Sequence, residues 1–410
     1  MAGWLKETKK DVEIKIILFL ISPFISFLYS LRRLNTKSSY IVIFLSSIFF
    51  GIAFNAEKVV NGEFDYDSSF YRMKFENYVF INFYEYKEGF ISFLAFDDGK
   101  KDYYFDTVAF YISRFTDNYH YLFMVFSIVF SYFFLKSLKF FTQEEKFNFS
   151  LICFILLFLF TFNQIFNING ARFWTAAWVA VYCIFQVHRN NKIYYLLLAL
   201  ITPFIHGTYW IFVFILFSSI FLVRYNRFWT ILFFISFLAS SLAIEFIKLS
   251  QSYLPEFLSK MVDQYTSEEN MQKGWSGFGW LPEVFKYLVI FYTNFLVFLF
   301  IRHSAEIKSN IKTERLYSFL LMWVTIFNFM MIIPSLGNRY IQLSYPIIAY
   351  IWLVVFYRNK YDYVILFLPL IFVWEIMRYF RYYKDTLDVS FYFSSPVYIV
   401  YKYLISFNGM

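Results

Sequence analysis

The chain contains a series of unbroken apolar runs, many of them about 17–22 residues long, such as 149–166 and 171–187. A chain that crosses a lipid bilayer must pair its backbone amides internally, so it crosses as helices or as a closed barrel. Barrel strands alternate apolar and polar residues over about ten residues. Continuous runs of this length instead match helices across a hydrocarbon core of roughly 30 Å. The runs therefore predict an all-α polytopic membrane protein.

The composition agrees with this fold class. Hydrophobic residues make up 60% of the 410 residues and charged residues 16%, whereas a soluble domain carries roughly 25% charged residues. We expect one integral membrane domain over 1–410, with about twelve transmembrane or half-membrane helices. The apolar runs fall at 14–31, 40–56, 119–140, 149–166, 171–187, 193–206, 208–223, 228–249, 283–301, 316–333, 340–357 and 361–377.

The charges in the connections predict an orientation. Short connections on one face are rich in Lys and Arg, which marks the cytoplasmic side of a membrane protein. These residues are Arg32, Arg33, Lys37, Lys136, Lys139, Lys146, Arg189, Lys192, Arg224, Arg227, Arg302, Lys308, Lys312, Arg315, Arg358 and Lys360. The outer face would carry three long segments, 57–118 with amphipathic helices, 250–282 and the C-terminal tail 378–410. The net charge of +8 is thus a topology signal, and no nucleic-acid partner is expected.

The N-terminal segment fits this orientation less simply. The pattern of connections puts both termini on the outer face. However, Lys6, Lys9, Lys10 and Lys15 precede or open the first run and favour the cytoplasm. The first segment, interrupted by Pro23, is alternatively a tilted or interfacial helix.

Residues 193–223 form one apolar stretch of 31 residues, which as a single helix would be about 46 Å long at 1.5 Å per residue. That is too long for an ordinary span, and Pro203 and Gly207 flank His206 in its middle. We expect two short helices with a break at His206, because irregular backbone at membrane depth is tolerated where it lines a cavity. The imidazole could then take a proton from a hydroxyl group. The alternative is a hydrogen-bonded core histidine.

Two arginines stand out because short outer loops are otherwise depleted of positive charge. Arg172 lies in FNINGARFWTAAW and Arg339 in PSLGNRYIQLSYP, each near the outer start of an apolar run. The planar guanidinium suits phosphate oxygens, and the positive end of a helix dipole favours an anion. Together they could form a phosphate or pyrophosphate site. Alternatively, each pairs with a nearby acid or reaches lipid headgroups.

The loop after the second run holds a polar cluster, GEFDYDSSFYRMKFENY, with Asp65, Asp67, Tyr71 and Arg72. An aspartate can orient a sugar hydroxyl or act as a base, and a tyrosine ring can stack on a sugar. The alternative is a solvated loop without a ligand.

Two further features of the outer segments are open to more than one interpretation. GWSGFGW, with Trp275 and Trp280, could be a carbohydrate platform or part of an interfacial aromatic belt. Asp97 and Asp98 could bind a divalent ion, but adjacent acids are common in loops. No nucleotide-binding, metalloprotease or nucleophile-elbow motif is present, and the histidines are not at ligand spacing. We therefore expect no metal and no cofactor.

The order of these motifs resembles the EpsG-like branch of the Wzy-type polysaccharide polymerases. The likeness covers about 40–360 and runs through DxxxYR, NGARFWTAA, a histidine between two short apolar stretches, and GNRY. By resemblance, the first-loop motif corresponds to Asp67, Tyr71 and Arg72, with Asp65 as the alternative aspartate. The later motifs correspond to Arg172, His206 and Arg339.

The resemblance implies an enzyme of the bacterial inner membrane whose active site faces the periplasm, with an architecture similar to the GT-C helical glycosyltransferases. Such an enzyme polymerises undecaprenyl-pyrophosphate-linked oligosaccharides, as in O-antigen or capsule synthesis. Its partners are these lipid-linked sugars and the bilayer. Whether a chain-length regulator protein also binds is left open.

The same resemblance implies roles for the candidate residues. The donor pyrophosphate would be held by Arg172, Arg339 and Arg72, and the acceptor proton would be taken by His206 or Asp67. The sugar would be bound by the remaining candidates, Asp65, Tyr71, Trp275 and Trp280.

Three other functions use similar chemistry. A flippase or exporter of lipid-linked sugars also needs buried cations, but it should show repeat symmetry and comparable loops on both faces. A polyprenyl-phosphate-dependent transferase would add one sugar instead of building a length ladder. A ligase would move finished polymer to a lipid core.

Overall fold

The structure is a computed structural model that describes residues 4–56, 59–60, 63–64, 67–97, 101–237, 280–383 and 386–406, with Leu249, Ser259 and Asp263. Within these residues the regular secondary structure is helical except for one antiparallel pair of two-residue strands. The strands are β1 (Val59–Val60) and β2 (Glu63–Phe64). The all-α fold class is confirmed.

The N-terminal segment is a helix pair that turns back on itself. α1 (Lys9–Ile21) ends at Ser22, where Pro23 opens α2 (Pro23–Ser30), because proline is tolerated only in the first turn of a helix. Ser26 Oγ donates to the Lys15 carbonyl at 2.8 Å, so the two helices lie side by side. The chain continues through η1 (Leu31–Arg33) into α3 (Lys37–Ile52).

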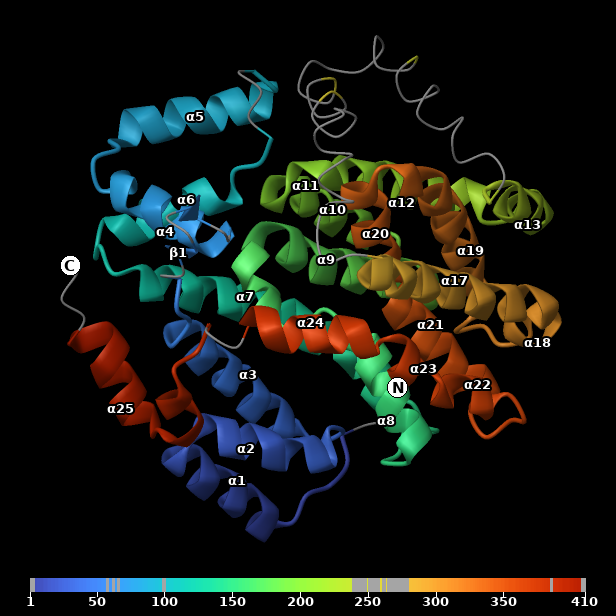
Figure 1. The fold of residues 1–410 in the computed structure, drawn as a ribbon, viewed down its shortest axis with the longest axis horizontal. Coiled ribbons are helices and arrows are strands. Elements are labelled where there is room, and N and C mark those ends of the chain that lie inside the picture. The colour runs from blue at the N-terminus through green and yellow to red at the C-terminus, as the bar shows by residue number, and fades with distance from the viewer. Residues whose placement is uncertain are drawn as a thin grey trace.

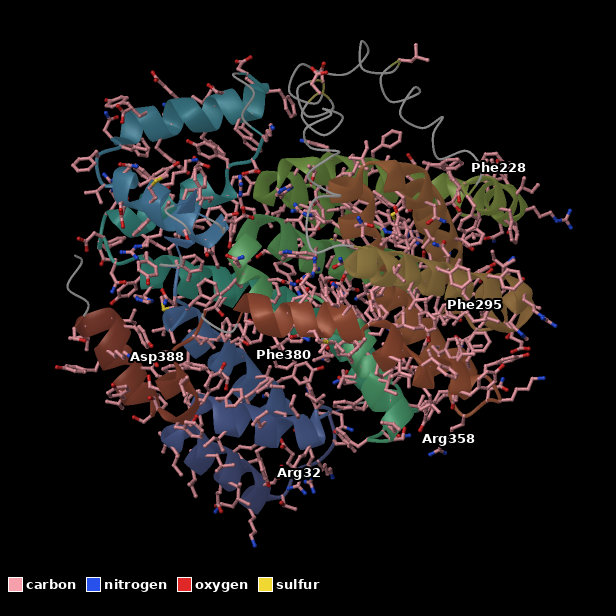
Figure 2. All side chains as sticks on the ribbon, viewed as in Figure 1. Arg32, Phe228, Phe295, Arg358, Phe380 and Asp388 are labelled. Carbon is pink, nitrogen blue, oxygen red and sulfur yellow. The ribbon has the colours of Figure 1, made fainter. Side chains whose placement is uncertain are left out.

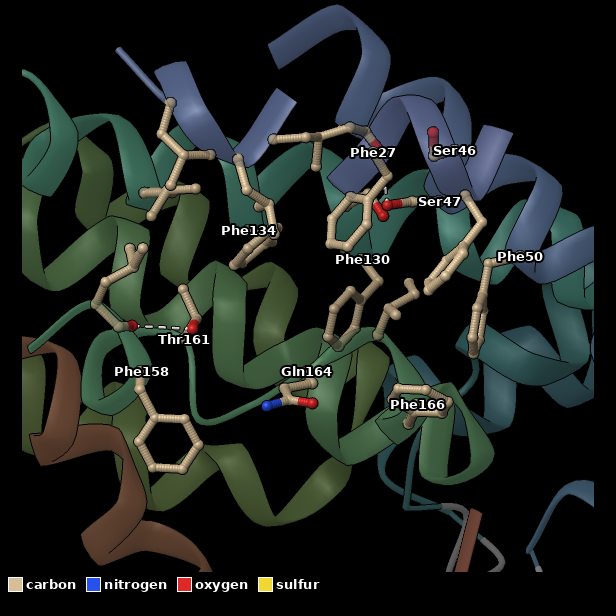
Figure 3. Close-up of a pocket in the computed structure, with 18 of the residues that line it drawn as sticks. Phe27, Ser46, Ser47, Phe50, Phe130, Phe134, Phe158, Thr161, Gln164 and Phe166 are labelled. Atoms are coloured by element: carbon tan, nitrogen blue, oxygen red, sulfur yellow. Dashed lines mark hydrogen bonds between the residues drawn. The ribbon is translucent and has the colours of Figure 1, made fainter. Parts of the chain in front are cut away.

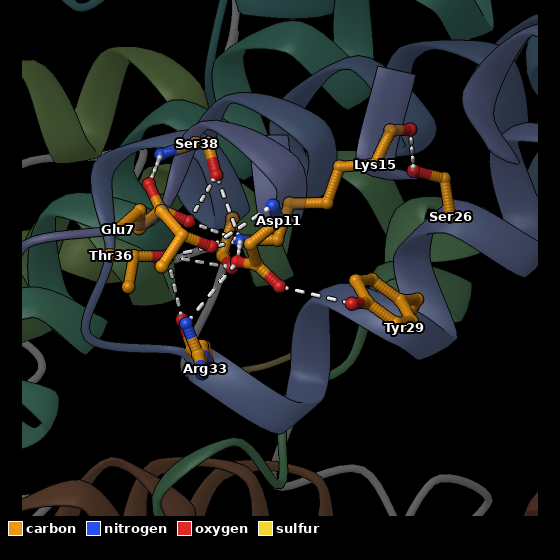
Figure 4. Close-up of polar contacts among 10 residues, drawn as sticks. Glu7, Asp11, Lys15, Ser26, Tyr29, Arg33, Thr36 and Ser38 are labelled. Atoms are coloured by element: carbon orange, nitrogen blue, oxygen red, sulfur yellow. Dashed lines mark hydrogen bonds and ion pairs between the residues drawn. The ribbon is translucent and has the colours of Figure 1, made fainter. Parts of the chain in front are cut away.

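A buried ion cluster holds this helix pair to the start of α3 (Figure 4). Lys15 is 1% exposed, and its ammonium group pairs with Glu7 and, at 3.1 Å, with Asp11. It also donates to Ser38 Oγ at 2.8 Å. A buried charge is tolerated when it is paired and hydrogen-bonded. The Lys15 ammonium meets this condition because two carboxylates pair with it.

The first described residues lie beside the first basic connection, where the Leu5 amide donates to the Asn35 carbonyl at 3.1 Å. Trp4 packs edge-on against Tyr40 at 4.8 Å, and the Lys139 ammonium lies 4.8 Å from the Trp4 ring centre. The expectation that both termini share the opposite face is therefore wrong for the N-terminus. The break between Ser22 and Pro23 is the reason, because it converts the run 14–31 into two short antiparallel helices.

The described residues of the segment 57–118 include three helices. These are α4 (Asp67–Tyr78), α5 (Phe83–Ala95) and α6 (Tyr104–Ser113). The Tyr103 amide donates to the Phe204 carbonyl at 3.0 Å, so the start of α6 is tied to a segment about one hundred residues later in the chain.

The central helices follow in two groups. The first group is α7 (Tyr119–Thr142), α8 (Leu151–Phe160), η2 (Ile165–Gly170), α9 (Ala171–Ile184) and η3 (Phe185–Arg189). The second group is α10 (Tyr195–Ala199), α11 (Ile201–Ile205), η4 (Gly207–Tyr209), α12 (Trp210–Leu222) and α13 (Asn226–Ile235). The expected break at His206 is confirmed, because its backbone is extended at φ −152° and ψ 117°.

The C-terminal half begins with a long helix and ends in short ones. Its first part is α17 (Trp280–Arg302), α18 (Ser304–Lys308), α19 (Glu314–Phe329), η6 (Met330–Ile332), α20 (Pro334–Ile341), η7 (Gln342–Ser344), α21 (Tyr345–Ile351) and η8 (Trp352–Phe356). Its second part is α22 (Asp362–Leu366), α23 (Leu368–Ile371), α24 (Val373–Tyr383), η9 (Val389–Phe393), α25 (Pro396–Val400) and η10 (Tyr401–Ile405).

Four segments of the described chain are long and apolar enough to cross a membrane, and a bent pair raises the number to five if it counts as one span. The four are Tyr119–Thr142, Leu151–Arg189, Val284–Arg302 and Leu336–Phe356. The pair is Asp362–Ile371 and Val373–Phe380, bent by 40°. Three apolar helices are shorter, namely Lys37–Ile52, Tyr195–Ile205 and Gly207–Leu222. Several of the predicted runs are thus shorter or broken helices.

The arrangement of the helices separates two ends of the molecule. Figure 1 shows α4, α5 and α6 together at the upper left, while α18 and α22 lie toward the lower right. In Figure 2, Arg32 and Arg358 lie along the lower margin, away from α4–α6. Large apolar side chains face outward between these ends, for example Phe228 at 54% and Phe380 at 76% exposure. Such a surface suits contact with lipid.

Candidate functional site

The candidate site forms around Arg172, the second residue of α9. Its Nε donates to the Tyr71 hydroxyl at 3.1 Å, and its Nη1 donates to both Asp102 carboxylate oxygens at 2.9 and 3.3 Å. Tyr71 comes from α4 and Asp102 from the residues just before α6. The segment 57–118 therefore fixes two edges of the guanidinium.

Asp102 also connects Arg172 to the broken helix. Its Oδ2 accepts a long hydrogen bond from the Gly207 amide at 3.4 Å. A Cβ at Gly207 would overlap the carbonyl of Lys101, so only glycine lets the two backbones approach this closely. The glycine next to His206 therefore brings the histidine to the Arg172–Asp102 pair.

His206 stands at the start of a hydrogen-bonded relay. Its Nδ1 lies 2.8 Å from Thr208 Oγ1, and that hydroxyl lies 2.8 Å from the Tyr340 hydroxyl. The Tyr340 ring stacks on Phe327 at 4.9 Å, and its carbonyl accepts from Trp323 Nε1 at 3.0 Å. The relay thus joins the broken helix to the GNRY motif and fixes the orientation of the imidazole.

Arg339 approaches the same region from α20. Its guanidinium carbon lies 5.5 Å from the centre of the Phe173 ring, and the Phe173 ring meets the His206 ring edge-on at 5.3 Å. Within the described residues no carboxylate pairs with Arg339, which is exposed. The two predicted arginines and the predicted histidine are therefore brought together.

Asp67 lies at the start of α4, beside the NGARFWTAA motif. Its Oδ2 is 3.5 Å from the position that a Cβ on Gly170 would occupy. The neighbouring Ser68 amide donates to Asn169 Oδ1 at 3.2 Å. The asparagine and glycine of the motif thus dock α4 next to the N-terminus of α9, which carries Arg172.

Other predicted residues lie apart from this cluster or outside the description. Arg72 Nε donates to Glu76 at 3.3 Å, and its guanidinium lies over the Tyr119 ring at 4.7 Å, so its observed contacts differ from those of Arg172. Trp280 is the first residue of α17. Asp65 and Trp275 lie outside the described residues.

The sequence analysis considered Asp97 and Asp98 as ligands for a divalent ion but expected no metal. Asp97 is exposed, while Asp98 lies outside the described residues. In the part of the chain that the structure describes, no three His, Cys, Asp or Glu side chains are grouped as metal ligands would be.

Burial changes the ionisation of the residues that hold Arg172. It raises the pKa of the Asp102 carboxyl, and the Arg172 guanidinium opposes this by lowering the pKa. It also raises the pKa of the Tyr71 hydroxyl to about 12. The phenol is therefore neutral at physiological pH, and its oxygen can accept a hydrogen bond from Arg172.

The sequence analysis did not assign a role to four residues near the site: Lys101, Asp102, Thr208 and Tyr340. Tyr340 is the last residue of GNRY and Thr208 follows Gly207 directly, so their positions could have suggested them. Asp102 gave no such signal, since it lies in the charged stretch GKKDYYFD. Only the fold of the segment 57–118 back onto α9 identifies it.

These observations define a class of protein: a polytopic helical membrane protein with guanidinium groups, a histidine and a carboxylate gathered at one end. The EpsG family matches residues 38–360. The chain belongs to this family, and the family places it among membrane proteins of polysaccharide biosynthesis. No curated protein and no solved structure matches the chain.

Proposed function

We propose that this protein polymerises undecaprenyl-pyrophosphate-linked oligosaccharide repeat units on the outer face of the bacterial inner membrane. The observation that supports this most directly is the geometry around His206: Arg339 lies over the Phe173 ring that meets His206, and Asp102 joins Arg172 to Gly207. Two cations beside a candidate base suit the departure of a diphosphate from a sugar, because that reaction needs charge stabilisation and positioning above all.

The reaction transfers a glycosyl group. A hydroxyl oxygen at the non-reducing end of the acceptor unit attacks the anomeric carbon of the donor chain. The bond from that carbon to the pyrophosphate oxygen breaks, and its electron pair leaves with the diphosphate. Arg172 and Arg339 neutralise the departing charge, and the hydroxyl proton passes to His206 or Asp67. Arg72 remains a proposed third cation for substrates that extend along α4.

The sugar contacts belong to the same proposal. Tyr71 lies against Arg172, so a sugar attached to the bound diphosphate would reach the segment 57–118. Asp65, Trp275 and Trp280 complete the proposed sugar-binding set. The helical architecture would be similar to that of the GT-C glycosyltransferases, and a chain-length regulator remains a proposed partner.

The choice between the two bases can be tested through the relay. Thr208→Val removes the hydroxyl that meets His206 Nδ1 at 2.8 Å while keeping a similar volume. If His206 is the base, the turnover number should fall by roughly 10²-fold, the usual contribution of a positioned general base. If Asp67 is the base, Thr208→Val should retain most of the activity and Asp67→Asn should lose it.

The function itself is tested by incubating the purified protein with a synthetic lipid-linked repeat unit and analysing product length on a gel. A ladder of chain lengths is expected. Arg172→Ala should reduce its formation by roughly 10²–10³-fold, the usual loss when one charge-stabilising donor is removed. Arg224→Ala is the control, since Arg224 is an exposed arginine of the basic end. Products extended by one sugar only would indicate a single-sugar transferase instead.

A further inference from the structure

A long apolar groove runs between α2, α3 and α7 on one side and α8 on the other (Figure 3). Its volume is about 370 Å³, and its walls are mainly phenylalanine and leucine. Three of the hydroxyl groups in the wall are used internally. Ser46, Ser47 and Thr161 donate to the backbone carbonyls of Pro23, Ile43 and Leu157, at 2.7, 2.8 and 2.9 Å. Ser131 also lines the groove, and its hydroxyl has no hydrogen-bond partner among the described residues. With Gln164 and Tyr392, it adds a few polar groups to a surface that is mainly hydrocarbon.

The groove follows the length of the membrane-crossing helices. Leu34 and Leu138 line it near the basic end, while Gln164 and Phe166 line its other end. Phe166 meets Phe50 edge-on at 5.0 Å, with η2 leading directly from there to Gly170. A 3₁₀ helix rises about 2 Å per residue, so the groove ends roughly 8 Å from Gly170.

Gly170 lies between this end of the groove and the candidate site along the chain. Asp67 lies against this glycine, and Arg172 follows it by two residues. A molecule with a hydrocarbon tail in the groove would therefore place a polar head beside Arg172.

The groove is also open to the bilayer. Phe154 of α8 lines it and is 65% exposed, and it lies within the apolar segment Leu151–Arg189. Its exposed ring faces the environment of a membrane span, so a lipid chain could enter sideways. At ~30 Å³ for each small group, as for water in the liquid, the volume holds about a dozen carbon atoms, or about two isoprene units.

We propose that this groove holds the isoprenoid tail of the lipid-linked substrate, next to the diphosphate that Arg172 binds. This inference rests on the proposed function. Lipid tails are as apolar as the groove wall, so leaving the bilayer gives little hydrophobic gain. The groove instead acts by shape, because it holds the first isoprene units in one direction and so aligns the diphosphate with the arginines.

The test uses a polyprenyl diphosphate that carries a photoreactive group on its second isoprene unit. The purified full-length protein is irradiated with this probe in nanodiscs, and the labelled peptides are identified by mass spectrometry. Labelling should fall on peptides from α3, α8 and residues 161–166. Labelling that maps only to segments that do not line the groove would overturn the proposal, and this measurement needs no variant.

Ser47→Phe fills the groove from α3 and should lower labelling severalfold, because its ring occupies volume that the tail would take. Ser218→Phe is the matched control, because Ser218 is also a half-buried serine on an apolar helix but does not line the groove. Unchanged labelling of a folded Ser47→Phe variant would contradict the proposal.

A polyprenol probe without the diphosphate separates a substrate site from a general lipid site. The diphosphate probe should label the groove more strongly, and Arg172→Ala should remove that difference. Equal labelling by both probes of the unsubstituted protein would overturn the inference. Labelling requires no polymerisation, so a labelled groove without a product ladder would refute the proposed function alone. A ladder with labelling elsewhere would refute only the groove.

Discussion

The Arg172–Asp102 pair should respond asymmetrically to substitution. The Asp102 side chain is 5% exposed and that of Arg172 is 33% exposed. Breaking a buried ion pair by removing one partner costs about 3–5 kcal/mol, because the other charge remains buried without compensation. Arg172→Met leaves the carboxylate in that position and should lower the free energy of unfolding by about 3–5 kcal/mol.

Asp102→Asn should cost less, about 1–2 kcal/mol. The guanidinium that remains is partly solvated and keeps its bond to Tyr71, and the new amide oxygen still accepts a hydrogen bond. The assay is thermal unfolding of each purified variant in the same detergent. Lys74→Met is a control: Lys74 is 41% exposed and 3.5 Å from Asp106, and such a pair contributes about 0–1 kcal/mol.

The double variant completes the test. In Arg172→Met/Asp102→Asn no buried charge is left unpaired, so it should be more stable than Arg172→Met alone despite carrying one more change. Coupling between contacting residues typically reaches about 0.5–3 kcal/mol. Equal losses for the two single variants, or strict additivity in the double variant, would refute the reasoning. A stable but inactive double variant would separate the ligand-binding role of Arg172 from its structural role.

Three further predictions concern other parts of the site and fold. Lys15→Met should destabilise the protein by about 3–5 kcal/mol in the same unfolding assay, since it strands two carboxylates, whereas Lys9→Met at a 92% exposed position should have little effect. Burial raises the pKa of Asp102, and its carboxylate must be ionised to hold the guanidinium. Polymerisation should therefore begin to decline, as the pH falls, at a pH above about 3.9, the ordinary pKa of Asp. If the Asp102→Asn variant shows the same decline, Asp102 is not the titrating group. Gly207→Ala should reduce product formation at least as much as Thr208→Val, because its Cβ overlaps the Lys101 carbonyl; a fully active variant would show that this close approach is not needed.

The helix break at His206 could be predicted because the signals were local. Proline and glycine on either side of the histidine, within a stretch too long for one span, predicted the extended residue that the structure has. Arg172 and Arg339 could also be singled out, because the charge pattern of the loops makes an isolated arginine conspicuous. In both cases the physical cause lies within a few residues of the site.

The number of spans and the partner of Arg172 could not be predicted in this way. Hydropathy measures how apolar a run is, and it does not show that Pro23 folds the run 14–31 back on itself. Asp102 reaches Arg172 where the chain around it bonds to the broken helix, through the Tyr103 amide and the Phe204 carbonyl at 3.0 Å. Long-range pairings of this kind leave no periodic trace in the sequence.

The two arginines of the site differ in how firmly they are held, and this should determine how each tolerates lysine. Arg172 uses Nε for Tyr71 and Nη1 for Asp102, while its Nη2 has no hydrogen-bond partner among the described residues. The oriented fork thus presents free donors in a fixed direction, which one ammonium group cannot reproduce.

Arg339 is exposed, and its guanidinium lies over the face of the Phe173 ring. A lysine can also lie over an aromatic ring, and a flexible ammonium can still neutralise a phosphate as a point charge. Arg339→Lys should therefore retain most of the product ladder, within roughly tenfold of the unsubstituted protein. Arg172→Lys should lose about as much as Arg172→Ala, roughly 10²–10³-fold. If the two lysine variants retain equal activity in the repeat-unit assay, charge alone accounts for both arginines, and the fork held by Asp102 and Tyr71 has no separate role.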